Sequence, residues 1–412
     1  MSQAGRTSDL IYLDYNSACP MEPEVQDAVA RAIDNFWQDP STDYGGAACK
    51  AAVEESRGKV AKMINAVPEE IIFTSCGTEA NNMVIMSAVQ AYEDFKTTRR
   101  VDPVFEEAVK KLPNLPHIIT TSIEHDSIAG PLNFLESKKL CEVTRVSVDK
   151  KSGAVSEDDV TGAIRPNTCL ITIMMANNET GVMQPVVDVA RLLKDANAKR
   201  AEQLLPPVLL HTDAAQVIGK DLVDVQEDDG FDFLTMSGYK FYGPRIGALY
   251  VRKGVRFFPI MFGGGQEKKL RPGTENTPMI VGLGKAAEMV STKLKEYKGH
   301  MEGMRNLLER SLTESLGADV IINFKESDRL PNTSCVTFKC LPGTASAMLS
   351  ACKSLITGRS GDPKPSPVLL ACSISKESAL RTVRFSVGRR TTNAEIEEAV
   401  KKICELALPP KK

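Results

Sequence analysis

Two short apolar runs near the middle of the chain each end at a residue that can carry chemistry. Val208-Leu209-Leu210 leads into His211-Thr212-Asp213, and Phe233-Leu234-Thr235-Met236 leads into Ser237-Gly238-Tyr239-Lys240. Apolar runs of this length are typical of strands that are buried on both faces of a sheet. We expect the two strands to be neighbours whose carboxyl ends meet at one edge, where ligands bind in α/β proteins.

The first 265 residues alternate between strand and helix patterns. Helical periodicity follows several of the apolar runs, and Ser156 is placed to cap a helix over residues 156–164. The alternation predicts an α/β fold with a mostly parallel sheet sandwiched by helices. The polar segment 94–115 contains prolines and is expected to be a surface excursion. Seven runs are expected to form strands, the last of which closes the sheet: residues 71–75, 117–122, 143–148, 168–175, 208–213, 233–237 and 247–251.

The pattern changes after Gly265, where a long helix over about residues 278–298 leads into a smaller α+β region. Residues 354–367 are rich in glycine, serine, lysine and proline, so we expect a mobile loop there. Three parts are expected: residues 1–20 as an N-terminal segment that packs with the small domain, 21–276 as the large domain that carries the site, and 277–412 as the small domain.

Composition excludes several classes of protein. The chain has 412 residues, of which 42% are hydrophobic and 25% charged, as in an ordinary globular protein with more than one domain. A formal net charge of −2 argues against a nucleic-acid or anionic-membrane surface. No apolar stretch approaches the roughly 20 residues that span a bilayer, and the polar first ten residues fit neither a signal nor a transit peptide. We expect a cytosolic protein.

The cysteines and histidines favour no structural framework. Ten cysteines are scattered without a C-x-x-C pair, and the four histidines have no paired spacing. Such spacing argues against both a disulfide framework and a zinc site. We therefore expect no metal site and free thiols, most of them buried, one of which can serve as a nucleophile.

Asp213 and Lys240 together indicate a cofactor. A lysine at a strand end can form a Schiff base with pyridoxal 5′-phosphate, and an aspartate on the next strand can pair with the protonated pyridine nitrogen, which makes the ring an electron sink. Each residue alone is more often a surface charge. In combination, with their flanking residues, they predict a pyridoxal-phosphate site.

Loops at the same edge supply further candidates for this site. Gly77 and Thr78 lie between a strand and a helix, where N–H groups and a hydroxyl can bind phosphate, and Ser237 can join them. Both patterns also occur for helix capping and turns alone. His125 follows a strand and can stack on the cofactor ring while moving protons, although a single histidine is usually structural.

Two amides and a glycine-rich loop complete the candidates. Asn178 and Gln216 can hydrogen-bond the ring hydroxyl, with turn formation as the alternative for the asparagine. The segment 263–274 begins with three glycines and includes Arg271-Pro272-Gly273-Thr274. It fits either a plain loop or a close contact at a subunit boundary.

Longer motifs carry a resemblance to a known family. In order and at compatible spacing, from about residue 10 to the last helix, they resemble the cysteine desulfurase and selenocysteine lyase group of the class V, fold-type I pyridoxal-phosphate enzymes. The resemblance implies the fold of a fold-type I transferase. The motifs are residues 12–16 (YLDYN), 73–82 (FTSCGTEANN), 123–127 (IEHDS), 177–181 (NNETG), 241–250 (FYGPRIGALY), 262–278 (FGGGQEKKLRPGTENTP), 365–370 (PSPVLL) and 384–389 (RFSVGR).

The resemblance also implies a role for each matching residue. Lys240 is the Schiff-base lysine, Asp213 the pyridine partner and His125 the stacked acid–base. Arg384 binds the substrate α-carboxylate with its bidentate fork, although from the residues alone it is only a charge beside an apolar strand. The remaining contacts are those of Asn178 and Gln216 with the ring oxygen, Asn178 also with substrate, of Gly77, Thr78, Ser237 and Tyr239 with the phosphate, and of Thr274 from the other subunit of a homodimer.

The family carries a cysteine on a loop of the small domain that takes sulfur or selenium from the substrate. Cys352 fills this place, beside Lys353, whose positive charge would favour a thiolate. Cys340 and Cys372 compete for the role, but both lie beside apolar runs and are typical of structural residues. The chain from Cys352 to Pro365 is a few residues longer than the family pattern.

Tyr239 is a second departure from the family. It stands where the family has a histidine that contributes to phosphate binding. A phenol can donate one hydrogen bond but brings no positive charge. The departure therefore concerns cofactor affinity more than chemistry.

The expected activity is that of a homodimer that converts L-selenocysteine to L-alanine, with Lys240 as the amine and with Cys352 or a reductant accepting the selenium. Alternatives are a cysteine desulfurase that acts on L-cysteine, an aminotransferase, which needs no Cys352 loop, and a catalytically weakened scaffold that binds a selenium or sulfur acceptor. An acceptor protein such as selenophosphate synthetase is an expected partner, whereas nucleic acid and membranes are not.

Overall fold

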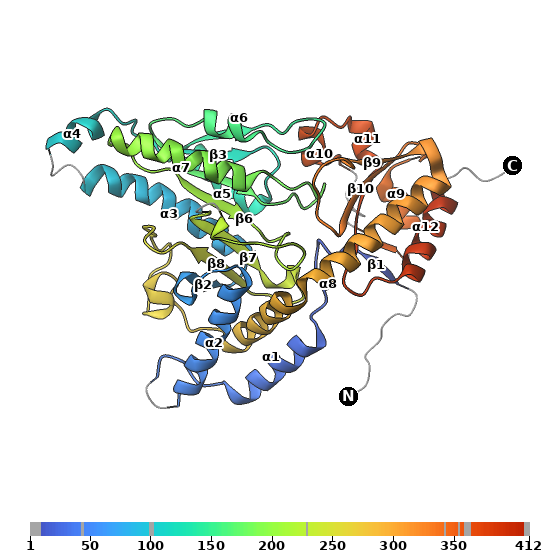
Figure 1. Cartoon of the computed structure of the whole chain (residues 1–412), viewed down its shortest axis with the longest axis horizontal. Helices are drawn as coiled ribbons and strands as arrows, with labels where there is room; N and C mark the ends of the chain where they lie inside the picture. The colour runs from blue at the N-terminus through green and yellow to red at the C-terminus, as the bar shows by residue number, and fades with distance from the viewer. Residues whose placement is uncertain are drawn as a thin grey trace.

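The computed structural model describes residues 10–42, 45–98, 103–227, 230–341, 343–352, 355–357 and 364–407 (Figure 1). A seven-stranded sheet with helices on both faces forms the larger part, and a three-stranded sheet with its own helices forms the smaller part. The expected α/β fold is confirmed. Among the residues that the structure describes, no helix combines the length and hydropathy needed to cross a membrane.

The larger sheet is parallel except for one strand. β8 runs antiparallel to both of its neighbours, β2 and β7, and the remaining neighbours pair in parallel. β6 and β7 pair in parallel, so their carboxyl ends lie side by side, as the two apolar runs predicted. The strand order is β2 (Ile71–Thr74), β8 (Gly247–Val251), β7 (Phe233–Ser237), β6 (Leu209–Asp213), β5 (Thr168–Met174), β3 (His117–Thr121) and β4 (Glu142–Val146).

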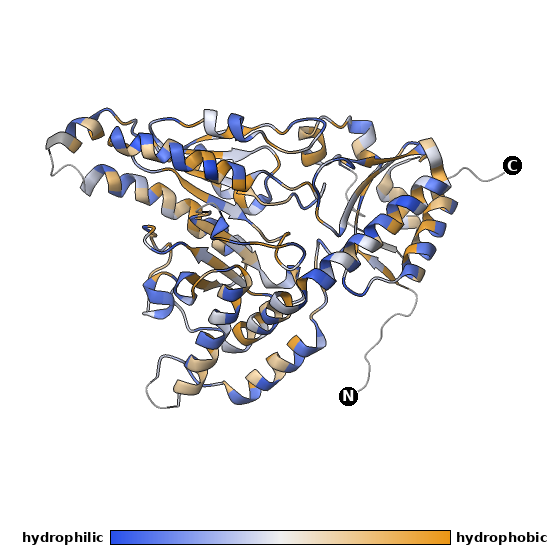
Figure 2. Ribbon diagram, viewed as in Figure 1, coloured by the Kyte–Doolittle hydropathy of each residue, from blue (hydrophilic) through white to orange (hydrophobic). Residues whose placement is uncertain are grey.

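Both faces of this sheet are covered, because successive strand residues point to opposite sides. Ile118 and Phe233 belong to one core, whereas the next residues, Ile119 and Leu234, belong to the other. Hydrophobic residues accordingly gather on the strands and on the inner sides of the helices (Figure 2). The helices of the first core are α3 (Gly77–Thr98) and α5 (Asp126–Ser137), and those of the second are α1 (Pro23–Asn35), α2 (Ala47–Met63), α6 (Glu157–Gly162), α7 (Val186–Glu202) and the first half of α8 (Thr277–Leu316).

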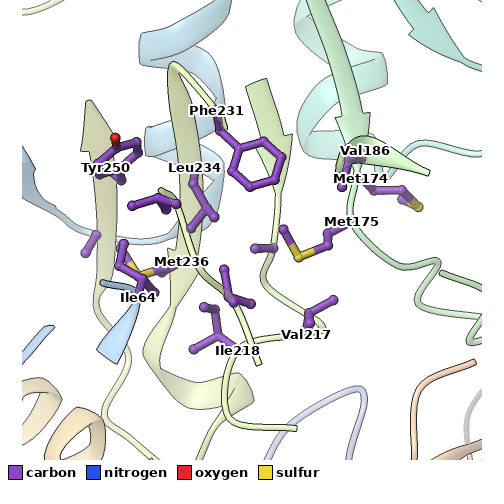
Figure 3. Packing of buried hydrophobic residues seen from close by; sticks show 14 of the residues in the cluster. Ile64, Met174, Met175, Val186, Val217, Ile218, Phe231, Leu234, Met236 and Tyr250 are labelled. Atoms are coloured by element: carbon purple, nitrogen blue, oxygen red, sulfur yellow. The ribbon is translucent and has the colours of Figure 1, made fainter. Parts of the chain in front are cut away.

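The second core is packed with large side chains directly behind the strands that end at the predicted site. Leu234 and Met236 of β7 lie beside Tyr250 of β8, and Phe231 covers the start of β7 (Figure 3). All four side chains are almost fully buried. A core packed to this density holds its strands with little freedom, so the residues at the strand ends are held in place from below.

α8 is longer than expected. It was predicted to end near Lys298, but it extends from Thr277 to Leu316 and has 40 residues in all. Gly299 faces open space within the helix, and Met301, Leu308 and Leu312 continue the apolar stripe beyond it. The first half of α8 packs on α1 and α2, and the second half packs on α12 (Asn393–Ala407) (Figure 1).

The smaller part is built on an antiparallel sheet. Its hydrophobic core also contains Ile11 and Leu13 of β1 (Ile11–Leu13), the first described strand of the chain, although β1 lies far in sequence from the other residues of this core. The sheet order is β12 (Thr382–Ser386), β10 (Thr333–Phe338) and β9 (Val320–Asn323), and the accompanying helices are α9 (Ala345–Ala351), α10 (Pro367–Ala371), α11 (Lys376–Leu380) and α12. The division of the chain into domains at residues 20 and 276 stays a prediction.

Two expectations about the path of the chain are wrong. β8 does not close the sheet, because the short connection after β7 returns it antiparallel beside β7, and β2 takes the edge. The segment 94–115 was expected to be a surface excursion, and its described residues are mostly exposed or half-buried; most of them are helical, since α3 extends to Thr98 and α4 (Pro103–Lys110) follows it. Part of the expected loop 354–367 is a strand, β11 (Leu355–Thr357), which pairs in parallel with β1. Residues 358–363 of that loop lie outside the described residues.

Candidate functional site

The carboxyl ends of five strands meet around one cavity of about 250 Å³. It receives residues that follow β2, β3, β5, β6 and β7, together with two residues of the N-terminal segment and one of β12. Ten of the predicted site residues line it: Gly77, Thr78, His125, Asn178, Asp213, Gln216, Ser237, Tyr239, Lys240 and Arg384. Thr274 and Cys352 do not. Their roles stay predictions.

Lys240 is the amine of this cavity. It ends the short turn Gly238–Lys240 that follows β7, and its Nζ donates to the main-chain oxygens of Asn16 at 2.7 Å and Ser17 at 2.8 Å. Burial, followed by the nearby Arg384 guanidinium, lowers the pKa of Lys240 to about 8. A substantial fraction of the amine is therefore neutral near physiological pH and able to act as a nucleophile.

Asp213 is the carboxylate. It is the last residue of β6, and its Oδ1 accepts a hydrogen bond from the Ala215 N–H at 3.0 Å. Its Oδ2 accepts a second one from Asn81 Nδ2 at 2.9 Å. Both donors are neutral, so the structure gives Asp213 no cationic partner among these contacts and leaves its charge available to a cation in the cavity.

His125 stands at the start of α5 as its N-cap residue. Its Nδ1 accepts from the Ser127 N–H at 3.1 Å and lies 2.9 Å from Ser127 Oγ. The first contact occupies Nδ1 as an acceptor, so the hydrogen of a neutral ring sits on Nε2. His125 can therefore offer Nε2 to whatever binds in the cavity.

A candidate anion site lies at the N-terminus of α3. Gly77 is the first residue of this 22-residue helix, and a Cβ built on it would come within 3.8 Å of Ser237 Oγ. Free N–H groups and the helix dipole favour a negative group at such an end, and Thr78 and Ser237 add hydroxyls. The site thus has the donors that a phosphate needs.

Tyr239 lies between two cations. Lys240 Nζ is 4.7 Å from the centre of its ring, and the Arg245 guanidinium is 5.6 Å from it. Burial raises the pKa of Tyr239, so the phenol stays protonated and can donate. Arg245 supplies positive charge next to the position where the family has histidine.

Arg384 reaches the cavity from β12 of the small sheet. Its Nη1 donates to the Asn178 main-chain oxygen at 2.8 Å, and its Nη2 pairs with Asp14 at 2.5 Å. Its Nε is buried and makes no hydrogen bond with the described residues. A guanidinium held in this way, with donor capacity to spare, is suited to a carboxylate ligand.

Asn16 and Lys220 are parts of the site for which the sequence patterns gave no role. The Asn16 main-chain oxygen accepts from Lys240, as described above, and from Gln216 Nε2 at 3.1 Å. Lys220 is buried and donates to Asn16 Oδ1 at 3.0 Å and Gln216 Oε1 at 2.9 Å. Burial lowers the pKa of Lys220 to about 7. Asn16 belongs to a motif that carried the family resemblance, and Lys220 follows Gln216 by four residues, but neither position has a chemical pattern of its own.

Thr274 and Cys352 lie elsewhere. Thr274 is exposed and lines a separate hollow beside Phe73 and Arg271. Cys352 caps the end of α9 rather than lying on an open loop, and only 7% of its surface is exposed within the small core. Lys353, expected beside it, lies outside the described residues.

The other cysteines differ in whether they are buried or reach the cavity. The ten cysteines stand outside disulfides and most are buried, as expected. Burial raises the pKa of Cys372 to about 11, which fits a structural thiol. Burial is also the main cause of the raised pKa of Cys340, which is partly exposed. Cys76, which sequence reasoning left out, lines the cavity next to Gly77.

Known proteins similar to this chain match nearly all of it. The family model described as Aminotransferase class-V matches residues 11–399. Selenocysteine lyase of Rattus norvegicus is 46% identical over 401 residues, which cover 94% of this chain and 92% of that protein. Cysteine desulfurase of Trichormus azollae is 35% identical over 406 residues, which cover 96% and 92%. A solved structure of a NifS-like protein matches with a TM-score of 0.83 at 31% identity, and the match covers 96% of this chain and 99% of that one.

Proposed function

This chain belongs to the aminotransferase class-V family, and we propose that it is a pyridoxal-phosphate-dependent selenocysteine lyase that converts L-selenocysteine to L-alanine. The observation that carries the proposal is the pairing of the Lys240 amine and the Asp213 carboxylate in one cavity, at the ends of neighbouring strands. The identity to selenocysteine lyases over nearly the whole chain supports this substrate over others of the family.

The residues of the cavity fit pyridoxal 5′-phosphate. They supply an amine, a carboxylate, an imidazole and a helix N-terminus with two hydroxyls, which match the aldehyde, pyridine nitrogen, ring face and phosphate of this molecule. When bound, the cofactor supplies an electron sink that makes the α-proton of an amino acid acidic and the Cβ–Se bond labile.

Lys240 has two tasks in this proposal. Its lowered pKa of about 8 provides a neutral amine for the cofactor aldehyde near neutral pH. Once the substrate amine has replaced it, the same Nζ can take the substrate α-proton. The carbonyl oxygens of Asn16 and Ser17 hold the amine at this position through hydrogen bonds.

Asp213 and His125 act on the cofactor ring. Asp213 keeps the pyridine nitrogen protonated, since its negative charge has only neutral donors beside it in the chain. His125 stacks on the ring and offers Nε2 to reacting atoms, because Nδ1 is occupied by Ser127. Gln216 and Asn178 contact the ring oxygen in this proposal, and Asn178 also contacts the substrate.

Arg384 binds the substrate α-carboxylate. In the structure its fork is taken up by Asp14 and by the Asn178 carbonyl. A substrate carboxylate can compete with Asp14 for the same guanidinium. The phosphate is held by Gly77, Thr78, Ser237 and Tyr239, with Thr274 contributed by the second subunit of a homodimer.

The selenium acceptor proposed from the sequence is Cys352. Transfer breaks the Cβ–Se bond, forms an S–Se bond on the thiol and leaves a proton on Cβ, so selenocysteine and one thiol give alanine and a selenenylated cysteine. A reductant or an acceptor protein such as selenophosphate synthetase then removes the selenium. Because Cys352 lies in the small core, it must leave its place at the end of α9 to reach the cavity. Cys76 already lines the cavity and is the competing thiol.

A cysteine desulfurase is the second candidate function. The 35% identity to such an enzyme over nearly the whole chain favours it, and L-cysteine differs from L-selenocysteine only in the chalcogen. We propose a cytosolic location for either enzyme.

Alanine release from L-selenocysteine and from L-cysteine, measured side by side on the cofactor-loaded protein, tests the proposal. We expect the specificity constant for selenocysteine to exceed that for cysteine, because the selenol ionises and leaves more readily. A preference for cysteine would favour the desulfurase. Absence of alanine from both substrates, with cofactor bound, would exclude both activities.

A further inference from the structure

Asn81 is a fully buried amide on α3 that has no role in the proposed chemistry so far. It lies one helical turn after Gly77 and is 0% exposed. Its Nδ2 donates to Asp213 Oδ2 at 2.9 Å and to Ser127 Oγ at 2.8 Å. One amide nitrogen therefore joins the end of β6 to the start of α5, through both of its hydrogens.

The hydrogen bonds continue from Ser127 to His125. Because the Ser127 oxygen accepts from Asn81, its own hydrogen is free to point at His125 Nδ1, 2.9 Å away. The Ser127 N–H points at the same nitrogen. An unbroken set of contacts thus runs from the Asp213 carboxylate through Asn81 and Ser127 to the His125 ring.

The other end of the amide has no partner. Asn81 Oδ1 is buried and makes no hydrogen bond with any residue that the structure describes. Turning the amide over would place this oxygen against the Asp213 carboxylate, so the orientation is fixed by charge. Buried polar atoms without partners are rare, and each calls for an explanation. Such a residue weakens the fold, and an apolar side chain of the same size would serve packing better.

We propose that Asn81 is a positioning residue that holds Asp213 and His125 as a single unit, with the carboxylate oriented toward the ring nitrogen and the imidazole presenting Nε2. The inference rests on the proposed function, which gives these two residues their roles. Asn81 itself acts through them and touches no reacting atom. Its unpaired oxygen is explained by this task, since among neutral side chains a primary amide is the group whose single nitrogen supplies two donors, here to one carboxylate and one hydroxyl.

The test compares Asn81→Leu with a matched control, Asn82→Leu. The control changes the adjacent asparagine, which donates to the Thr78 carbonyl of its own helix. We expect Asn81→Leu, measured without cofactor, to unfold at a temperature close to that of the unchanged protein, because removal of the unpaired buried carbonyl offsets the loss of its two hydrogen bonds. Its affinity for pyridoxal phosphate should fall by about tenfold to a hundredfold, the usual cost of losing a residue that orients a ligand-binding group. Asn82→Leu should keep its affinity.

A second arm separates this inference from the proposed function. In protein without cofactor, the ¹⁵N resonances of His125 report the hydrogen bonds to Nδ1, and only four histidines must be assigned. The Nδ1 resonance should move in Asn81→Leu and in Ser127→Ala but not in Asn82→Leu. An unmoved His125 resonance in Asn81→Leu would overturn the inference whether or not the protein binds cofactor. Failure of the loaded protein to release alanine would instead overturn the proposed function alone.

A double variant completes the test. Ser127 reaches Asp213 only through Asn81 in this set of contacts, so Ser127→Ala should cost little further cofactor affinity once Asn81 is leucine. Non-additivity of this kind is the signature of residues that act in one network. Fully additive losses, or a loss of thermal stability in Asn81→Leu that matches its loss of affinity, would show that Asn81 is structural and would overturn the proposal.

Discussion

The seven-stranded and the three-stranded sheets contribute to the cavity in different ways. At the edge of the seven-stranded sheet, polar residues follow the strands and face a cavity, as Asp213 and Lys240 do. In the three-stranded sheet, polar residues lie within the strands and pair with one another, as Thr337 and Thr382 do at 2.7 Å. Arg384 is the residue through which this sheet reaches the cavity.

The difference shows where chemistry can be positioned without cost to packing. Residues beyond a strand end are held by the strand but lie outside the core, so a charged group there keeps access to ligand. A thiol inside the small core, such as Cys352, is protected from ligand by the same packing that fixes it. Either the large sheet alone carries the chemistry or the small region supplies a reacting group, and variants of single residues distinguish the two.

The largest expected effect is at Lys240. Lys240→Ala should abolish covalent capture of pyridoxal phosphate and all release of alanine, because this is the amine that the cavity presents to the cofactor. Absorption spectroscopy of the loaded protein and an alanine assay measure the two losses. The exposed Lys138 gives a matched control, since Lys138→Ala should retain both properties. Alanine release by Lys240→Ala would show that the large sheet does not supply the reacting amine through Lys240.

The position of the acceptor thiol tests whether the small region, through Cys352, or the large sheet, through Cys76, receives the selenium or sulfur. Cys352→Ala should strongly suppress alanine release from cysteine, because sulfur needs a thiolate acceptor, and should reduce release from selenocysteine less. Parallel assays of Cys352→Ala and Cys76→Ala on both substrates measure this, with Cys372→Ala as the control for loss of a buried thiol. Full activity of Cys352→Ala together with loss in Cys76→Ala would move the acceptor to the edge of the large sheet.

The pH dependence of cofactor capture tests the electrostatics of the cavity. The neutral amine reacts, and the pKa of Lys240 is lowered to about 8. The capture rate should therefore rise with pH by about tenfold per unit well below pH 8 and become constant above it. Arg384→Met removes a charge that lowers this pKa, so its profile should shift to higher pH. A flat profile between about pH 6 and 9 would contradict the assignment of the pKa to the reacting amine.

The smallest effect is expected at Tyr239. Tyr239→Phe should weaken cofactor binding by about 1 kcal/mol, the usual net value of one neutral hydrogen bond. Tyr239→His should bind the cofactor at least as tightly, most visibly below about pH 6.5, where an unperturbed histidine is charged. Cofactor titrations of the three forms measure both changes. Equal affinities would mean that this side chain does not contact the phosphate.

The sequence predicted the large sheet well because its signals are local. Each apolar run is a strand, and a residue such as Asp213 or Lys240 is placed by the strand that it follows. The order of strands was less accessible, since the position of β8 depends on how the chain turns after Lys240. The end of α8 was missed because Gly299 weakens a helix in isolation, whereas packing in the small core sustains it.

The site itself was predictable where a residue type carries its chemistry. Lysine, aspartate and histidine at strand ends are conspicuous, and the structure brings Lys240, Asp213 and His125 to one cavity. Residues that act through hydrogen bonds alone were not predictable. Lys220 and Asn81 acquire their positions only when distant elements pack together. Asn81 lies in a motif that carried the family resemblance, but neither residue has a local chemical pattern that indicates its hydrogen bonds.

The length of α8 has a mechanical consequence. At 1.5 Å per residue, its 40 residues extend roughly 60 Å. Leu283 and Ala287 pack in one core, and Leu308 and Leu312 pack in the other. Unfolding of either core would expose half of a helix whose other half stabilises the second core. The two regions should therefore lose structure in one cooperative step on heating, and a flaw introduced in the small core should lower the melting temperature of the sheet that holds Lys240.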